Sequence, residues 1–193
     1  MDESAVCFHT PETKQKSKQW LPKGTPGPVK ARVHASRKKQ MVFAFFDGAG
    51  AIYEHYAPLG AKVNANYMVS VLGKFLKILT RKRPNLTPET LLLHWDNAPV
   101  HTAAVTQEFL TKKGVKTLPH PPYSPDLAPA DFWFFPTVKT ALSGVSIDGQ
   151  TVKHQWERAV KTLGAPAFNT AFRRWLERHE KCIRVEGDYV EKC

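Results

Sequence analysis

The chain has 193 residues, of which 42% are hydrophobic, and a formal net charge of +11 at pH 7. This length suits one domain with a sizeable core, and the positive charge favours a polyanionic partner, nucleic acid before an acidic membrane surface. No run of about 18 apolar residues exists, and the start MDESAVCFHT does not resemble a secretory signal. Three cysteines without close spacing indicate neither a disulfide framework nor a zinc cluster. These features favour the cytoplasm or the nucleus and no membrane span.

The first part of the chain predicts a strand, a basic segment and a hairpin. The strand is expected over residues 3–8. Residues 10–39 hold nine lysines and arginines against one acid, a net charge of +8, and their prolines and glycines exclude a long helix. Trp20 and Leu21 lie inside this segment, so it is more than a solvated tail. Residues 40–58 are two apolar and aromatic runs joined at Asp-Gly-Ala-Gly, which predicts a β-hairpin.

The remainder alternates helices with short strands. Helices are expected from Asn66 to Pro84, from His101 to Lys113, from Pro129 to Ser143, and near 150–162 and 167–181, with strands at 91–95 and 115–118. This order predicts one α/β domain over residues 1–193, with helices packed on a mixed sheet.

Several aspartates could carry chemistry. Asp96 ends the apolar run LLLHW, at the edge of a sheet where α/β proteins bind ligands, but it could equally cap the next helix. Asp131 falls in the first turn of a helix, where the dipole favours an acid by roughly 0.3–1 kcal/mol. That placement allows a purely structural role, and it also holds a carboxylate rigidly, as a metal site requires. Asp126 suits a turn acceptor.

A divalent-metal site needs a further acid, and two candidates remain. Two Mg²⁺ ions held by carboxylates could stabilise the attacking and leaving oxygens of a phosphodiester displacement. Asp47 is better explained as part of the hairpin turn. Asp2 precedes the apolar strand AVCF, whose pattern suits the centre of a sheet, although a disordered terminal residue is the simpler explanation.

Two motifs resemble the catalytic domain of mariner-type transposases, in the Tc1/mariner superfamily. HWDNAPVHTA is followed by LPHPPYSPDLAPADFWFF, which contains the family signature YSPDLAP at 123–129. Asp96 and Asp131 are separated by 34 residues, as in the aspartate triad of that family, and Asp2-Glu3 matches its first catalytic position. EKCIRVEGDYVE resembles the family's ending, so the resemblance covers essentially the whole chain.

The resemblance implies an RNase H-like fold, a mixed sheet flanked by helices, with Asp2, Asp96 and Asp131 as catalytic residues and metal ligands. It implies Mg²⁺ or Mn²⁺, as two ions, and cut-and-paste transposition in the nucleus. Water cleaves double-stranded DNA at the transposon ends, and the freed 3′-OH attacks a TA target. His94 and His101 fit positioning or structural roles better than metal ligation.

The resemblance also implies DNA contacts and a homodimer. Residues 10–39 correspond to a long insertion that holds the transposon end and contributes to dimer contacts. Trp20, Arg32 and Tyr123 are candidate DNA contacts. A core anchor, a solvated cation and a loop-packing aromatic explain the same three residues equally well.

One departure from the family concerns the region before the triad. Members carry two helix-turn-helix modules there, and they are absent from this sequence, which starts one residue before Asp2. An excised catalytic domain, a truncated gene product or a domesticated remnant would explain this, and we expect DNA binding with little sequence preference. The alternative function is a non-catalytic DNA-binding or dimerisation module. An RNase H-type protein acting on RNA is disfavoured by the signature.

Overall fold

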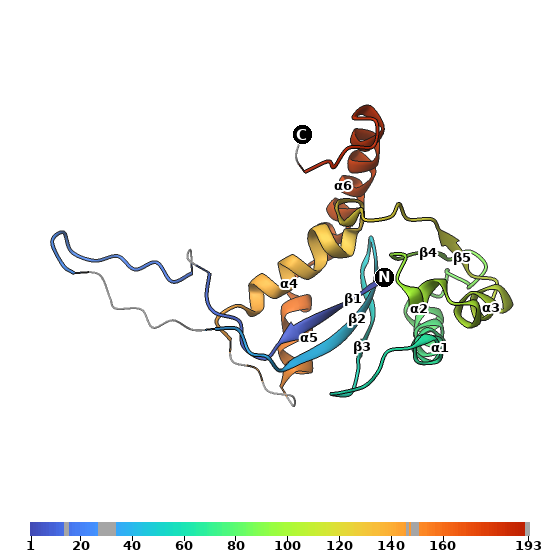
Figure 1. The fold of residues 1–193 in the computed structure, drawn as a ribbon, viewed down its shortest axis with the longest axis horizontal. Helices are drawn as coiled ribbons and strands as arrows, with labels where there is room; N and C mark the ends of the chain where they lie inside the picture. The colour runs from blue at the N-terminus through green and yellow to red at the C-terminus, as the bar shows by residue number, and fades with distance from the viewer. Residues whose placement is uncertain (14–15, 27–33, 146, 148–150, 192–193) are drawn as a thin grey trace.

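The strands in the described part of the chain form two sheets. The computed structural model describes residues 1–13, 16–26, 34–145, 147 and 151–191 (Figure 1). An antiparallel sheet has the strand order β1 (Asp2–Cys7), β2 (Lys39–Asp47), β3 (Gly50–Tyr56), and a parallel pair joins β4 (Leu92–His94) to β5 (Lys116–Leu118). Parallel and antiparallel pairings are therefore both present, as predicted, but they occur in separate sheets.

Helices surround these sheets. They are α1 (Ala65–Lys82), α2 (Pro99–Thr102), α3 (Ala104–Lys112), α4 (Phe135–Leu142), α5 (Val152–Lys161) and α6 (Ala165–Arg184). The helix expected from Asn66 is confirmed as α1. Asn64 caps it by accepting a hydrogen bond from the backbone N–H of Tyr67 (2.9 Å), and Arg81 and Lys82 place positive charge in its last turn.

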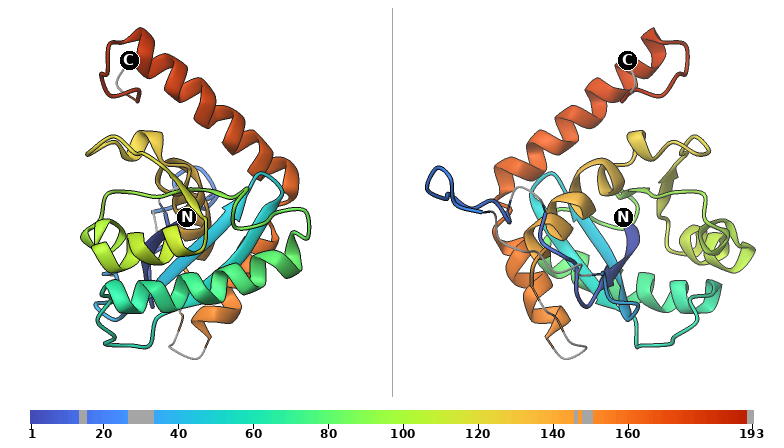
Figure 2. Two further views of the ribbon diagram at one scale, coloured as in Figure 1. Left: turned by 90° about the vertical axis from the view of Figure 1, so that its right-hand side faces the viewer. Right: turned by 60° about the vertical axis from the view of Figure 1, so that its left-hand side comes forward.

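The alternation of side chains along β2 divides the core in two. Phe43 and Phe45 face α1, where the rings of Phe45 and Phe75 stack with centroids 4.2 Å apart. Val42 faces the opposite way, into a cluster built around the fully buried Trp156 of α5. Successive residues of a strand point to opposite faces, so one strand serves both clusters. Figure 2 shows the helices on the two sides of this sheet.

The beginning of β1 lies beside the end of β4. The Met1 nitrogen donates a hydrogen bond to the carbonyl oxygen of His94 (2.6 Å), which brings Asp2 close to the loop after β4. The expectation that this strand occupies the centre of the sheet is wrong for the hydrogen-bonded ladder, because β1 is its terminal strand.

The helix expected from His101 to Lys113 is interrupted at Ala103, whose backbone is extended (φ −59°, ψ 139°). The interruption separates α2 from α3. Thr106 Oγ1 donates to the carbonyl oxygen of Val100 (2.7 Å), and Gln107 Nε2 donates to that of His101 (2.6 Å). These side chains satisfy carbonyls that the broken helix leaves without intrahelical partners.

The helix expected from Pro129 to Ser143 also has an irregular beginning. A 3₁₀ turn, η1 (Pro125–Leu127), precedes a π-helical turn, η2 (Ala130–Phe134), and regular α4 begins only at Phe135. Asp131 therefore lies in a π turn rather than in the first turn of an α-helix. Such turns widen the helix locally and are frequent at functional sites.

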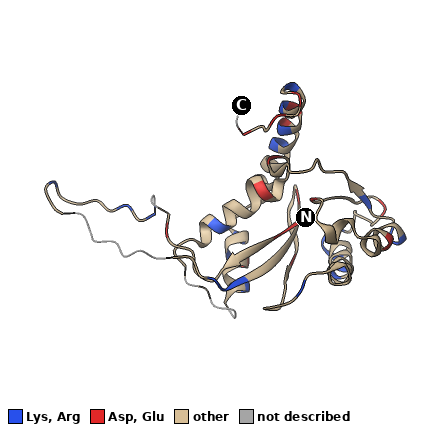
Figure 3. Cartoon of the chain, viewed as in Figure 1, with Lys and Arg blue, Asp and Glu red and all other residues tan. Residues whose placement is uncertain are grey.

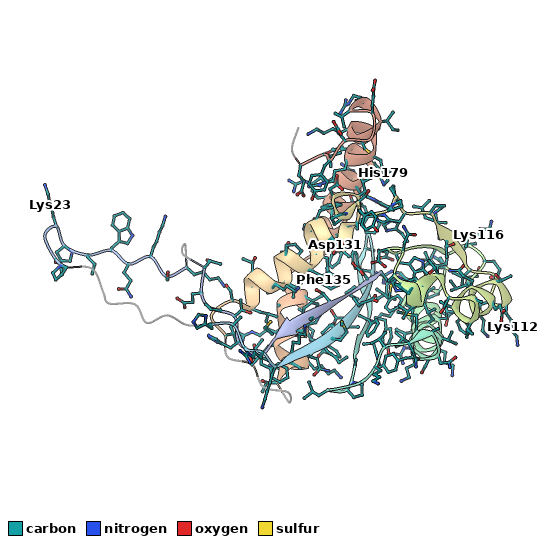
Figure 4. The ribbon with its side chains drawn as sticks, viewed as in Figure 1. Lys23, Lys112, Lys116, Asp131, Phe135 and His179 are labelled. Atoms are coloured by element: carbon teal, nitrogen blue, oxygen red, sulfur yellow. The ribbon has the colours of Figure 1, made fainter. Side chains whose placement is uncertain are left out.

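The described part of the basic segment extends away from the body of the molecule and is anchored at its base. Thr10 accepts a hydrogen bond from the Gly144 backbone N–H (2.8 Å). Lys16 Nζ donates to the carbonyl oxygens of Thr140 (2.8 Å) and Ser143 (3.2 Å), at the end of α4. Figure 3 shows the basic positions along the extension, and Figure 4 shows Lys23 far from the helices and sheets.

Candidate active site

Asp2 and Asp131 come from distant parts of the sequence and meet in the structure. Asp2 opens β1 and is buried, and Asp131 of η2 is half-buried (Figure 4). Burial and the neighbouring carboxylates of Asp131 and Glu3 raise the pKa of Asp2 to about 8. Burial also raises the pKa of Asp131, and its interaction with Asp2 opposes part of that rise. Asp2 is therefore largely protonated at neutral pH, because burial and the neighbouring carboxylates disfavour a further negative charge.

Asp96, which follows β4, completes this group of acids. Its negative charge acts on both Asp2 and Asp131. Its Oδ1 accepts hydrogen bonds from the Ala98 backbone N–H (3.0 Å) and from His101 Nδ1 (2.8 Å), and the hydrogen bond from His101 lowers its pKa. Asp96 thus shapes the turn before α2 and is also ionised beside the other two acids. The two explanations of Asp96 from the sequence are compatible.

His101 holds Asp96 in place from behind. Its ring is fully buried and stacks on Trp95, with centroids 4.3 Å apart and planes 3° from parallel. Its Nε2 lies 3.3 Å from Glu3 Oε2, an ionic contact without hydrogen-bond geometry. Although burial lowers the pKa of His101, its contacts with Asp96 and Glu3 raise it to about 9. A charged imidazole therefore links β1 to the loop after β4.

The contact between Glu3 and His101 could not be predicted from the sequence. These residues are far apart in the sequence, and no local pattern indicates their pairing. His94, which lines the same cavity as Asp2 and Asp96, is paired with other side chains. Its Nε2 is hydrogen-bonded to His120 Nδ1 (3.1 Å), its ring lies 4.7 Å from that of Trp175, and burial lowers its pKa to about 3.

The donor atoms of the three aspartates suit a hard divalent cation. Magnesium prefers carboxylate oxygens, and the raised pKa of Asp2 reflects burial and repulsion that a bound cation would offset. Within the described residues, no three His, Cys, Asp or Glu side chains are placed so that they could hold one metal ion as they stand. The chemistry of the three carboxylates nevertheless fits divalent metals.

Asp47, the other candidate acid, is engaged elsewhere. Its carboxylate accepts two hydrogen bonds from Arg83, Nε to Oδ2 at 2.8 Å and Nη2 to Oδ1 at 3.0 Å. It also accepts from the Ala49 backbone N–H in the hairpin turn (2.9 Å). Asp47 therefore stabilises the turn, as the Asp-Gly pattern indicates.

Asp126 of the signature loop has a structural role. Its side chain is 3% exposed, and its Oδ2 accepts a hydrogen bond from the backbone N–H of Val190 (2.9 Å). Arg178 Nη1 donates to the carbonyl oxygen of Asp126 (2.9 Å), and Trp175 Nε1 donates to that of Leu127 (2.7 Å). The loop therefore anchors α6 and the segment that follows it.

The structure describes two of the three candidate DNA contacts, Trp20 and Tyr123. Trp20 and Tyr123 are essentially fully exposed, at 102% and 99% of their reference areas, so neither is a core anchor or packs within its loop. Tyr123 also has a positive φ of 54°, which is uncommon for a residue with a side chain. Arg32 lies outside the described residues.

A cavity of about 500 Å³ opens beside the acids, between the strand ends and α6. Its lining is largely apolar and includes Phe46, Trp95, Trp175 and His179, while Asp2 and Asp96 contribute carboxylates. Figure 4 shows His179 on α6 and Asp131 below it near the start of α4. The group of acids is therefore reachable from the surface.

Among the described helices, none has the length and apolar character to cross a membrane.

Comparisons with known proteins agree on one family. The family model described as transposase (partial DDE domain) matches residues 10–88. The Mariner Mos1 transposase of Drosophila mauritiana is 31% identical over 194 residues, which are 98% of this chain and 55% of that protein. The chain thus spans little more than half of this relative.

Solved structures extend the comparison to three dimensions. A crystal structure of the mariner Mos1 paired end complex with Mg is 31% identical and covers 97% of this chain and 55% of its own, with a TM-score of 0.86. A structure of the Mos1 transposase catalytic domain and Raltegravir with Mn is 31% identical and covers 79% of this chain and 78% of its own, with a TM-score of 0.74. These matches confirm the expected RNase H-like fold. The chain therefore belongs to the mariner-type transposases of the Tc1/mariner superfamily and corresponds to their catalytic domain.

Proposed function

We propose that the protein is a divalent-metal-dependent DNA transposase and endonuclease, which cleaves DNA at transposon ends and transfers the strand into TA targets. One observation carries this proposal. Asp2 and Asp131, from distant parts of the chain, act electrostatically on each other, and both respond to the charge of Asp96. A purely structural role would not require three acids to be gathered at such an electrostatic cost.

Asp2, Asp96 and Asp131 are the residues that would hold Mg²⁺ or Mn²⁺, as two ions. Structures of the Mos1 relative contain these metals. Two bound divalent cations supply electrostatic stabilisation of the attacking and leaving oxygens of a phosphodiester displacement. His101 orients the Asp96 carboxylate and favours its ionised form, and Asp2 would have to release its proton to serve as a ligand.

The basic surface would hold the DNA backbones. In this proposal residues 1–193 act as one catalytic domain, and the insertion at 10–39 contacts a transposon end and a second copy of the chain in a homodimer. Trp20, Arg32 and Tyr123 would contact double-stranded DNA, and the exposure of the two aromatic rings supports their part. A chromosomal DNA substrate implies location in the nucleus.

Nicking of supercoiled plasmid DNA with Mn²⁺ tests the proposal. We expect wild-type protein to convert the plasmid to open circles and Asp96→Asn to be inactive, because Asn keeps the size of the side chain but removes the charge. Asp188→Asn, which removes an exposed acid in the C-terminal segment, is the matched control. Equal nicking by wild type and Asp96→Asn would contradict the enzymatic role.

The same preparation separates the alternative function. A non-catalytic DNA-binding or dimerisation module would bind DNA with a steep salt dependence. It would also show no metal-dependent nicking and no heat of Mn²⁺ binding by calorimetry.

A further inference from the structure

A lysine and a serine lie beside the group of acids without belonging to it. Lys139 of α4 is exposed, and its Nζ donates a hydrogen bond to Ser4 Oγ (2.7 Å) on β1. The positive charge of Lys139 also acts on Asp131, where it opposes the rise in pKa. The ammonium group is therefore within electrostatic range of the proposed metal ligands.

Ser4 and Lys139 lie further along the same two segments of the chain that carry Asp2 and Asp131. Ser4 is two residues after Asp2, so both lie on one face of β1. Asp131 and Lys139 are eight residues apart, with Phe135 between them, and Lys139 Nζ lies 6.0 Å from the Phe135 ring centre. Figure 4 shows Asp131 and Phe135 following one another along this helical segment.

The strand and the helical segment thus approach each other at two places. Asp2 and Asp131 act electrostatically on each other, and Lys139 is hydrogen-bonded to Ser4. Two residues of a strand span about 7 Å, which is comparable to the distance between neighbouring phosphates along one DNA strand. A DNA strand with one phosphate at the acids would therefore have another within reach of Lys139.

We propose that Lys139, oriented by Ser4, binds a DNA phosphate adjacent to the one that is cleaved. This inference rests on the proposed function. An ammonium group has three donors, and the bond to Ser4 uses one, so a phosphate can accept another. Three acids alone repel a DNA backbone, and a lysine beside them offsets that repulsion where the strand enters. Lys139 is then a substrate-positioning residue and not a metal ligand.

The first test is binding to a fluorescent DNA duplex across a range of salt concentrations, without metal. Lys139→Met removes the charge and keeps an unbranched side chain. We expect its slope of log affinity against log salt to be smaller than that of wild type by about 1, the value for one lost phosphate contact. Lys112→Met, on exposed α3 far from Asp131 in Figure 4, is the matched control and should lower the slope much less. Lys139→Arg should restore most of the slope.

The second test locates the phosphate. Duplexes with single neutral methylphosphonates are cleaved with Mn²⁺, and the products are mapped at nucleotide resolution. Wild-type protein should cleave poorly at bonds one or two nucleotides from the neutral position, by roughly 10- to 100-fold, the range for a lost hydrogen bond to a charged group. Lys139→Met should cleave neutral and charged duplexes equally at those bonds, because it no longer has the contact that the methylphosphonate removes. Lys112→Met should be as sensitive to the methylphosphonate as wild type.

These outcomes distinguish the inference from the proposed function. The role of Lys139 is overturned if Lys139→Met equals wild type in metal-dependent cleavage, in methylphosphonate sensitivity and in salt slope. That result would leave the proposed enzymatic function intact. Absence of cleavage by wild type contradicts the proposed function. The salt slope then decides the phosphate contact alone, since it requires no catalysis.

Discussion

The signature loop contains one aspartate, Asp126, and replacing it should affect stability rather than chemistry. The perturbation is Asp126→Ala. It removes the carboxylate that accepts the hydrogen bond from the Val190 backbone N–H, and both residues are buried, at 3% and 5% exposure. Water cannot easily replace the lost acceptor, so the amide would remain without a partner.

The size of the effect follows from these contacts. Leaving a buried donor unsatisfied costs about 1–3 kcal/mol, and removing a buried carboxylate regains part of its desolvation penalty. We therefore expect a loss of about 2 kcal/mol in the free energy of unfolding, which corresponds to roughly 4–8 °C in melting temperature for a domain of this size. Asp126→Asn keeps an oxygen acceptor and should cost about half as much.

Urea unfolding followed by tryptophan fluorescence measures this difference, because Trp175 is hydrogen-bonded to the same loop. The midpoint should fall while the dependence on urea concentration stays constant. Below the melting temperature, Mn²⁺-dependent nicking by Asp126→Ala should resemble wild type, whereas Asp131→Asn should be folded and inactive. An unfolding free energy within about 0.5 kcal/mol of wild type would refute the anchoring role of Asp126.

Three further predictions follow from other contacts. Mn²⁺ at about 100 times its dissociation constant should stabilise the fold by about 2.7 kcal/mol, measured by differential scanning fluorimetry. Asp96→Asn should remove most of this stabilisation. Equal stabilisation of wild type and Asp96→Asn would exclude Asp96 as a ligand. Burial raises the pKa of Asp47, but the Arg83 guanidinium lowers it, so the folded-state pKa lies below the unfolded value of about 3.9. The ion pair therefore stabilises the fold above that unfolded value. This stabilisation is lost as the pH falls through the lower folded-state pKa. Arg83→Met should therefore cost about 0.5–1 kcal/mol at pH 7 and progressively less below pH 4, as measured by urea unfolding; a cost independent of pH would contradict the ion pair. Lys16→Met should lose about 0.3–1 kcal/mol, because Lys16 donates to carbonyls at the end of α4, and an unchanged urea midpoint would show that this contact contributes nothing.

The parts of the fold that could be predicted from the sequence have local causes. The spacing of apolar residues and the capping Asn64 define α1, and the Asp-Gly turn after β2 defines the hairpin. The expectation that Asp126 is a turn residue was also local, and its hydrogen bond with Val190 shows what the buried carboxylate does.

The features that could not be predicted depend on distant contacts. The break at Ala103 accompanies the turn of His101 into the core, where it meets Asp96 and Glu3, and a helical pattern contains no sign of that requirement. The contact between Lys139 and Ser4 joins residues from the two halves of the chain in the same way. The family resemblance identified the three aspartates, whereas their local patterns left each one open to a structural explanation.

The π turn at Ala130–Phe134, whose hydrogen bonds span one residue more than those of an α-helix, sets the direction of Asp131 relative to the regular helix that follows. Each residue of a regular helix advances the chain by about 100° around the axis. Deleting one residue from this turn would let it tighten to ordinary α geometry and would rotate Asp131 by about a quarter of a revolution away from Asp2. Phe135 and Val138 would meanwhile keep their places against the sheet. Deleting this one residue would thus remove Asp131 from the group of acids without unfolding the protein.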